Sequence, residues 1–92
     1  MNSELKEYIQ TKINQAKEKL DGFIELDSKW SPNQIENTLK ELGWKYNGLI
    51  RSGSSYQTES YEYSNYRHYR KYLLTFGWNG WTQEKYFGMI EK

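Results

Sequence analysis

The chain has no cysteine and a single histidine among its 92 residues. The missing cysteine excludes disulfide frameworks, thiolate nucleophiles and cysteine-ligated metal centres, and it favours a protein of a reducing compartment. One histidine is too few for a histidine-based metal site. No apolar run approaches the ~20 residues that a membrane helix needs. From these absences we expect a cytoplasmic protein that does not enter a membrane and holds neither a metal ion nor another cofactor.

Charge and aromatic residues divide the chain into two parts. Residues 1–43 hold six lysines against eight carboxylates, whereas residues 44–78 hold five cations, including all three arginines, against two carboxylates. Most of the aromatic residues also lie after position 43. The length fits one domain with a single core. We therefore expect one domain over 1–92, in which 1–43 is a helical scaffold and 44–92 is an antiparallel sheet that carries the working surface.

Two helices are predicted in the first part of the chain. Apolar residues spaced by three or four positions over Leu5–Leu20 form one stripe of a helix, and Gly22 is expected to end it. The sequence Ser31–Gln34 combines an N-cap serine, a proline at the first helical position and a glutamine at the third, which predicts a capping box. This second helix is expected to end at Gly43. The segment 23–30 between the two helices is expected to be a short connector.

After the second helix the apolar period changes from helical to extended. We expect a strand over 44–51 with a bulge near Gly48, a turn over 52–55, and a second strand around 61–63. Residues 67–78 alternate between two faces and predict a further strand. Apolar residues in the same segment also have helical spacing, so a helix is the alternative.

Asn79-Gly80, between Trp78 and Trp81, is typical of a two-residue type I′ hairpin turn, which would bring the two indole rings opposite each other. The tail over 82–92 is then a fourth strand, and a short C-terminal helix is the alternative. The expected fold is therefore α+β, with two N-terminal helices packed on one face of a three- or four-stranded antiparallel sheet.

The sequence contains no complete catalytic motif. Its glycines are too isolated for a phosphate-binding loop, and no serine lies in a nucleophile elbow that His68 could serve. His68 with Arg67 and Arg70 meets the minimum for metal-free ribonuclease chemistry, which needs a proton-transfer group beside cations. We assign no catalytic residue and expect a protein that is not an enzyme.

The sequence Leu-Lys-Glu-Leu-Gly-Trp at 39–44, followed by a predicted strand and by Arg-Ser-Gly-Ser-Ser at 51–55, resembles the opening of HicA-type toxins. These are small ribonucleases with an α-β-β-β-α fold. The resemblance implies an α+β architecture and a ribonuclease activity. However, Ser55 stands where that family has its catalytic histidine, so a ribonuclease of this kind would have to use His68.

Cationic and aromatic residues alternate over 66–72, as they do in surfaces that bind RNA or single-stranded nucleic acid. Tyrosine and arginine are also enriched in protein interfaces. Nine tyrosines are more than a core of this size can bury with satisfied hydroxyl groups, so several should be exposed. The predicted partner-binding residues are Arg51, Tyr56, Tyr61, Tyr63, Tyr66, Arg67, His68, Tyr69, Arg70 and Lys71.

The formal net charge of +1 gives only a weak field for attracting nucleic acid, which favours a protein partner. We expect a non-enzymatic protein that docks on a protein of a nucleic-acid-handling complex. Its size and its Lys-, Asn- and Tyr-rich composition resemble small inhibitors encoded by phages and mobile elements, including anti-CRISPR proteins. RNA or single-stranded DNA binding is the first alternative, and a ribonuclease toxin is the second. The apolar stripe of the first helix also allows a homodimer.

Overall fold

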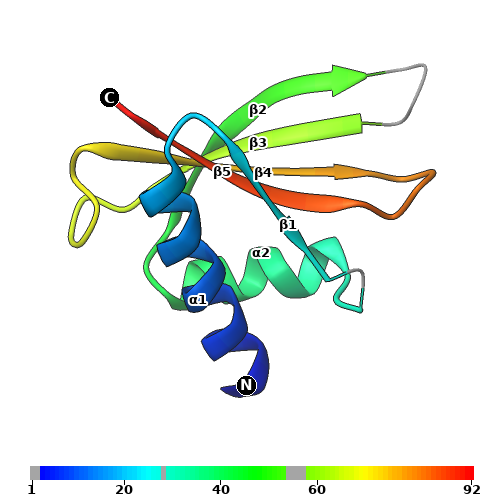
Figure 1. Cartoon of the computed structure of the whole chain (residues 1–92), viewed down its shortest axis with the longest axis horizontal. Coiled ribbons are helices and arrows are strands. Elements are labelled where there is room, and N and C mark those ends of the chain that lie inside the picture. Colours follow the sequence, from blue (N-terminus) through cyan, green and yellow to red (C-terminus); the bar gives the residue numbers. More distant parts are fainter. Residues whose placement is uncertain (1–2, 28, 54–57) are drawn as a thin grey trace.

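In the computed structural model, which describes residues 3–27, 29–53 and 58–92, two helices lie on one face of a five-stranded antiparallel sheet. Figure 1 shows the arrangement, with both helices on the same side of the strands. In chain order the elements are α1 (Ser3–Lys19), β1 (Phe23–Leu26), α2 (Pro32–Glu41), β2 (Lys45–Gly53), β3 (Thr58–Ser64), β4 (Tyr72–Asn79) and β5 (Lys85–Glu91). The predicted α+β class is confirmed. Neither of the described helices is long and apolar enough to cross a membrane.

Helix α1 buries the predicted apolar stripe, namely Leu5, Ile9, Ile13 and Ala16. Its predicted end at Gly22 is wrong, because α1 ends at Lys19 and the left-handed positions are Leu20 (φ 35°) and Asp21 (φ 61°). The backbone N–H of Asp21 donates to the carbonyl oxygen of Met89 at 3.1 Å. This bond to β5 holds the chain at Asp21, so the helix stops before the glycine.

Helix α2 begins and ends as its sequence predicts. Ser31 Oγ accepts a hydrogen bond from Gln34 N–H, and Gln34 Oε1 accepts one from Ser31 N–H, which completes the capping box. At the other end Gly43 has φ 94°, and Trp44 N–H donates to the Leu39 carbonyl oxygen at 2.9 Å. This is a Schellman ending, in which the glycine occupies the left-handed position.

The strands are ordered β1-β5-β4-β3-β2, and every neighbouring pair is antiparallel. The prediction of three or four strands after two helices is therefore wrong, because the predicted connector 23–30 contains β1. This strand has only four residues and pairs with β5 at the opposite end of the chain, with Phe23 opposite Gly88. So short a segment has no recognisable period of its own, and only the distant partner makes it a strand.

Strand β2 has irregular pairing with β3 at two places, between Tyr46 and Gly48 and between Leu49 and Arg51. The predicted bulge near Gly48 is confirmed, and this glycine has φ 140°. The strand continues to Gly53, so the predicted turn over 52–55 is wrong for its first two residues. The other two lie outside the described residues.

The predicted strand over 67–78 is wrong in its first part, because β4 begins only at Tyr72 and residues 65–71 form a turn. The Asn65 side chain accepts hydrogen bonds from the backbone N–H groups of Arg67 (3.3 Å) and His68 (3.2 Å). Backbone donors that bond to a side chain in this way cannot pair with a neighbouring strand.

The connection between β4 and β5 is a five-residue loop over 80–84, so the predicted two-residue turn is wrong. Asn79 Oδ1 accepts hydrogen bonds from the backbone N–H groups of Trp81 and the residue after it. Trp78 consequently pairs with Lys85 and not with Trp81. The tail after this loop is strand β5, which confirms the strand and excludes the alternative of a C-terminal helix.

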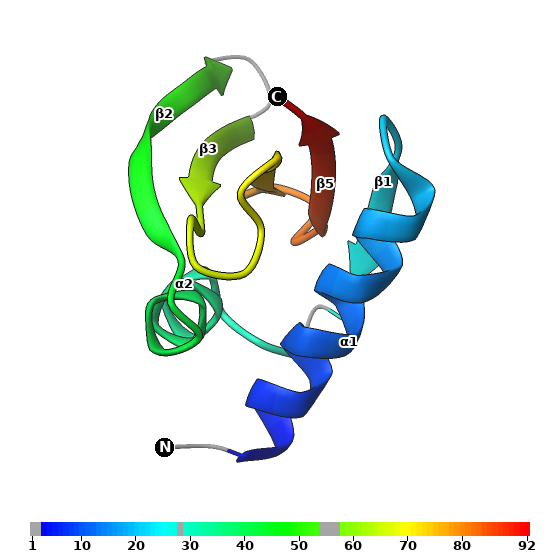
Figure 2. The same cartoon turned by 90° about the vertical axis from the view of Figure 1, so that its left-hand side faces the viewer.

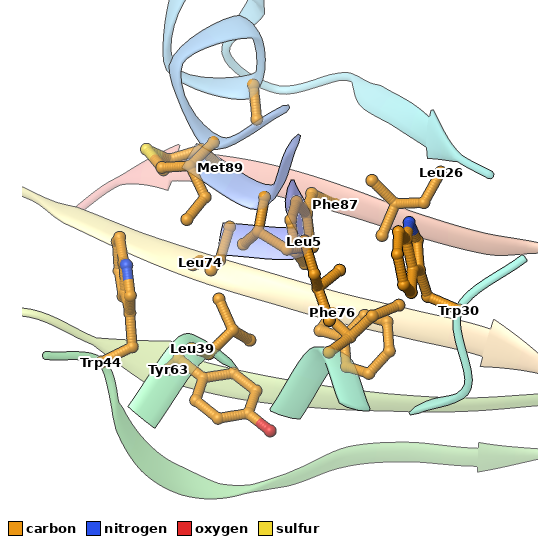
Figure 3. Packing of buried hydrophobic residues seen from close by; sticks show 14 residues of the cluster. Leu5, Leu26, Trp30, Leu39, Trp44, Tyr63, Leu74, Phe76, Phe87 and Met89 are labelled. Carbon is orange, nitrogen blue, oxygen red and sulfur yellow. The ribbon is translucent and has the colours of Figure 1, made fainter. Parts of the chain in front are cut away.

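Alternate residues of the strands face the helices and form the core (Figure 3). The fully buried apolar and aromatic residues of the strands are Tyr63, Leu74, Phe76, Phe87 and Met89, and α1 and α2 contribute Ile9, Ile13, Ile35 and Leu39. Figure 2, which looks roughly along the strands, shows the edge strands β2 and β1 on opposite sides, with α2 below the sheet and α1 rising along the β1 side. The residues between the buried ones point away from the helices, and we call this side the open face.

Candidate protein-binding surface

The predicted partner-binding residues do not form one surface. Tyr56 lies outside the described residues, and of Arg51 the structure describes only the backbone, within β2. Two of the tyrosines, Tyr61 and Tyr63, lie on the helix-facing side of β3. The other six predicted residues, at positions 66–71, belong to the turn over 65–71, between β3 and β4.

Tyr63 is a core residue, only 1% exposed, so in this structure it cannot reach a partner. Burial raises the pKa of its hydroxyl group above the usual range, and the charge of Glu36 adds to that effect. Tyr61 is partly buried and packed against the core, and its hydroxyl donates a hydrogen bond to Glu59. The sequence could not separate these two rings from the exposed ones, because tyrosine serves both cores and surfaces.

Two buried or partly buried side chains hold the turn over 65–71 in place. Asn65 is 2% exposed, and besides its bonds within the turn its Nδ2 donates to the Leu42 carbonyl oxygen at 3.3 Å. The Tyr69 ring packs on Trp44 with 4.8 Å between centroids, and the Tyr69 hydroxyl accepts a hydrogen bond from Gln10 Nε2 at 3.0 Å. The turn is therefore fixed to both helices and to the start of β2.

The five other predicted residues of this turn are exposed, namely Tyr66, Arg67, His68, Arg70 and Lys71. We call the segment 65–71 the basic loop. Lys92, at the end of the chain, adds a further cation, with its ammonium group 3.9 Å from the centre of the Tyr66 ring. Because the loop is held by Asn65 and Tyr69, its cations are presented on a fixed backbone, which lowers the entropy lost on binding.

The open face of the sheet carries a second surface, which the predicted partner-binding residues did not include. A depression of about 330 Å³, which we call the trough, is lined mainly by Phe23, Ile50, Ser60, Thr75, Tyr86 and Ile90. In a flat five-stranded sheet the edge strands would be about 19 Å apart. Phe23 belongs to one edge strand and Ile50 to the other, yet both line the trough. The sheet is therefore bent, with a concave open face.

Two glycine–aromatic pairs shape the trough. Gly77 lies opposite Tyr86 on β4 and β5, and a Cβ atom at Gly77 would overlap the phenol ring. Gly88 lies opposite Phe23, and a Cβ atom there would lie 2.9 Å from two carbons of the phenyl ring. The two rings meet edge to face, with centroids 4.8 Å apart. Each ring thus lies over a glycine of the neighbouring strand, where any other side chain would displace it.

Large apolar side chains of the trough remain exposed. Phe23 is 61% exposed, Ile50 53% and Ile90 44%. Singly exposed apolar residues are ordinary, but a contiguous concave group of them is typical of an interaction site. The sequence offered one signal, the two glycines inside predicted strands, which often mark a close approach of another group.

Three carboxylates lie at or near the trough. Asp21 lines it directly, Glu25 lies beside Phe23 and Tyr86, and Glu62 lies opposite Thr75 on the open face. Of the described lysines, Lys45 begins β2 at one end of this face, Lys19 Nζ bonds the Phe23 carbonyl oxygen, and the buried Lys85, beside Glu25, bonds the Gln83 carbonyl oxygen through its Nζ. Among the side chains that the structure describes, the border of the trough is therefore mainly acidic, whereas the basic loop lies at the ends of β3 and β4.

The described residues include no cluster of His, Asp and Glu that could hold a metal ion. His68 is exposed on the basic loop, beside Arg67, and its backbone N–H bonds Asn65. This arrangement can bind anions by charge. Its neighbours in the loop are cations, an asparagine and tyrosines, none of which is a carboxylate that could orient the imidazole for proton transfer.

Comparison of the chain with protein-family models, with curated proteins and with solved structures gives no match.

Proposed function

We propose that this is a small non-enzymatic binding protein of the cytoplasm that docks on a partner protein through the trough. The observation that carries the proposal is the concave apolar surface on the open face, with Phe23, Ile50 and Ile90 exposed around a floor of small residues. Burying one such side chain in an interface contributes about 1.5–3 kcal/mol. Three of them in one depression give the central apolar contact that protein interfaces need.

The acidic border favours a basic partner. Asp21, Glu25 and Glu62 would repel phosphates, so nucleic acid is a poor ligand for the open face. They would attract a protein segment that places apolar side chains in the trough and lysine or arginine beside them. A second copy of this chain would bring like charges together across the interface, which disfavours self-association through this face.

We place this partner in a nucleic-acid-handling complex, where the protein would act as an inhibitor of the kind that phages encode. Proteins that handle nucleic acids carry lysine and arginine where they contact phosphates. An apolar trough with an acidic border complements such a cationic surface and would compete with nucleic acid for it.

The proposal can be tested with a matched pair of variants on β2. Ile50 faces the trough, whereas Leu49 lies opposite Tyr61 on the other face, and the two side chains are 53% and 52% exposed. The immobilised protein is used to select peptides from a random display library. The selected peptides are expected to combine apolar residues with flanking lysine or arginine. Ile50→Asp should weaken their binding at least tenfold (about 1.4 kcal/mol), while Leu49→Asp should leave it nearly unchanged.

Equal loss of binding in both variants, with thermal unfolding unaltered, would contradict docking through the trough. Selection of acidic peptides would contradict the assignment of a basic partner. Dimers detected by light scattering, and abolished by Ile50→Asp, would show that a second copy occupies this face.

The basic loop supports RNA or single-stranded DNA binding as a second candidate function. Exposed Arg67, Arg70 and Lys71 can contact phosphates, and exposed Tyr66 can stack on a base. Saturable binding of labelled RNA that weakens steeply with salt, and is lost in Arg70→Ala, would support this function. The ribonuclease alternative requires RNA cleavage that His68→Ala abolishes.

A further inference from the structure

A second depression lies between helix α2 and the β2 edge of the sheet, on the side opposite the trough. It has a volume of about 290 Å³, and its lining residues are Glu36, Lys40, Tyr46, Tyr61 and Tyr63. Tyr46 pairs with Tyr63 across the strands, and Tyr61 is on the same face of β3. The Tyr46 ring centroid is 5.7 Å from that of Tyr63 and 5.8 Å from that of Tyr61, with the ring planes inclined by 65° and 53°. We call this depression the tyrosine pocket.

Two carboxylates make the tyrosine pocket attractive to a cation. Glu36 lines it, and burial raises the pKa of this carboxyl group, an effect that Lys40 opposes and Glu59 strengthens. Glu59 itself accepts a hydrogen bond from the Tyr61 hydroxyl group. A carboxylate that has lost part of its water is stabilised strongly by a hydrogen-bonding cation. Among the described residues that line the pocket, Lys40 is the single cation.

Elsewhere on the molecule, lysine side chains cover aromatic rings. Their ammonium groups lie between 3.9 and 5.6 Å from the ring centroids of Tyr8, Trp30, Tyr66, Tyr69 and Tyr72. Within the described part of the chain, no lysine or arginine takes such a position over the three rings of the tyrosine pocket. Tyr46 is nevertheless 46% exposed, so a cation from another molecule can reach its ring.

We propose that the tyrosine pocket binds a guanidinium group, as an arginine side chain of another protein presents it. A guanidinium group is planar and can stack on the exposed ring of Tyr46, and its N–H groups can bond a carboxylate such as Glu36 through two parallel hydrogen bonds. A quaternary ammonium would use the rings but could not bond the carboxylates. The pocket faces away from the trough, so this inference does not depend on docking through the trough.

The test is a titration of the whole protein with N-acetylarginine methylamide, followed by the NMR signals of the tyrosine rings at constant ionic strength. Saturable shifts are expected for Tyr46 and Tyr61. Tyr46→Leu and Glu36→Gln should each raise the dissociation constant at least tenfold. The matched controls are Tyr66→Leu on the basic loop and Glu41→Gln at the end of α2, and neither should change it.

Lys40→Gln is expected to bind the arginine derivative more tightly. A folding defect would weaken binding, so it could not produce this result. The Lys40 ammonium group competes for Glu36, so removing it should lower the dissociation constant by up to about fivefold. Three results would each overturn the proposal. The first is the absence of a saturable shift up to about 50 mM ligand, which is far above the millimolar dissociation constant expected for one charged group. The others are equal binding by all variants and tighter binding of tetramethylammonium than of the arginine derivative.

Discussion

Gly77 lies opposite Tyr86, and this pairing predicts opposite effects of Gly77→Ala in two backgrounds. The substitution should destabilise the natural protein and stabilise a variant that lacks the Tyr86 ring. Alanine is normally better than glycine inside a strand by about 0.5–1 kcal/mol, because glycine loses more backbone freedom on folding. At Gly77, however, a Cβ atom would overlap the Tyr86 ring. The ring would have to move by about 1 Å or more to restore a normal carbon–carbon contact.

Moving the Tyr86 ring would weaken two contacts that stabilise the fold. Its hydroxyl group is hydrogen-bonded to that of Ser60 at 3.3 Å, a bond that contributes about 1 kcal/mol. Its ring packs edge to face on Phe23 at 4.8 Å, which contributes about 0.5–1.5 kcal/mol. After the gain from alanine is subtracted, Gly77→Ala should lower the free energy of unfolding by about 1 kcal/mol. The melting temperature should fall by about 4–8 °C.

The control is the same substitution in a Tyr86→Ala background. With the ring removed, the Cβ atom has room, and Gly77→Ala should now raise the free energy of unfolding by about 0.5–1 kcal/mol. Urea unfolding followed by tryptophan fluorescence measures all four proteins of this double-mutant cycle. If Gly77→Ala changes stability in the same direction in both backgrounds, the ring does not lie over the glycine as described.

Two further predictions concern the basic loop and the tyrosine pocket. Asn65→Ala removes three hydrogen bonds, to Leu42, Arg67 and His68, so it should lower the free energy of unfolding by about 1–3 kcal/mol. Unchanged stability and unchanged amide exchange in the loop would contradict this prediction. Burial raises the folded-state pKa of Glu36 above 4.5, so folding favours its protonated form, and stability is lost as pH rises through the folded pKa. Glu36→Gln should therefore gain stability relative to the natural chain as pH rises through that folded-state pKa, and a flat or reversed difference in urea unfolding would refute it.

The elements that the sequence predicted well are those specified by contacts close along the chain. The stripe of α1, the capping box at Ser31 and the left-handed Gly43 all depend on residues within about one or two turns of helix. The bulge near Gly48 and the strand character of the tail were also predictable, because glycine and alternating residues are local signals. Five exposed residues of the basic loop were among the predicted partner-binding residues, although the loop itself was predicted as a strand.

The tertiary structure alone decided which aromatic rings are inside and which surface is left uncovered. Tyr63 is buried and Tyr66 is exposed, although the two lie three positions apart in the same tyrosine-rich segment. Strand β1 exists because β5 supplies its partner, and the trough exists because five strands bend until Phe23 and Ile50 line one depression. Composition and short-range patterns fix the helices and their ends, since those energies are local. The bent sheet, the trough and the tyrosine pocket arise from pairings between distant segments, which no local pattern records.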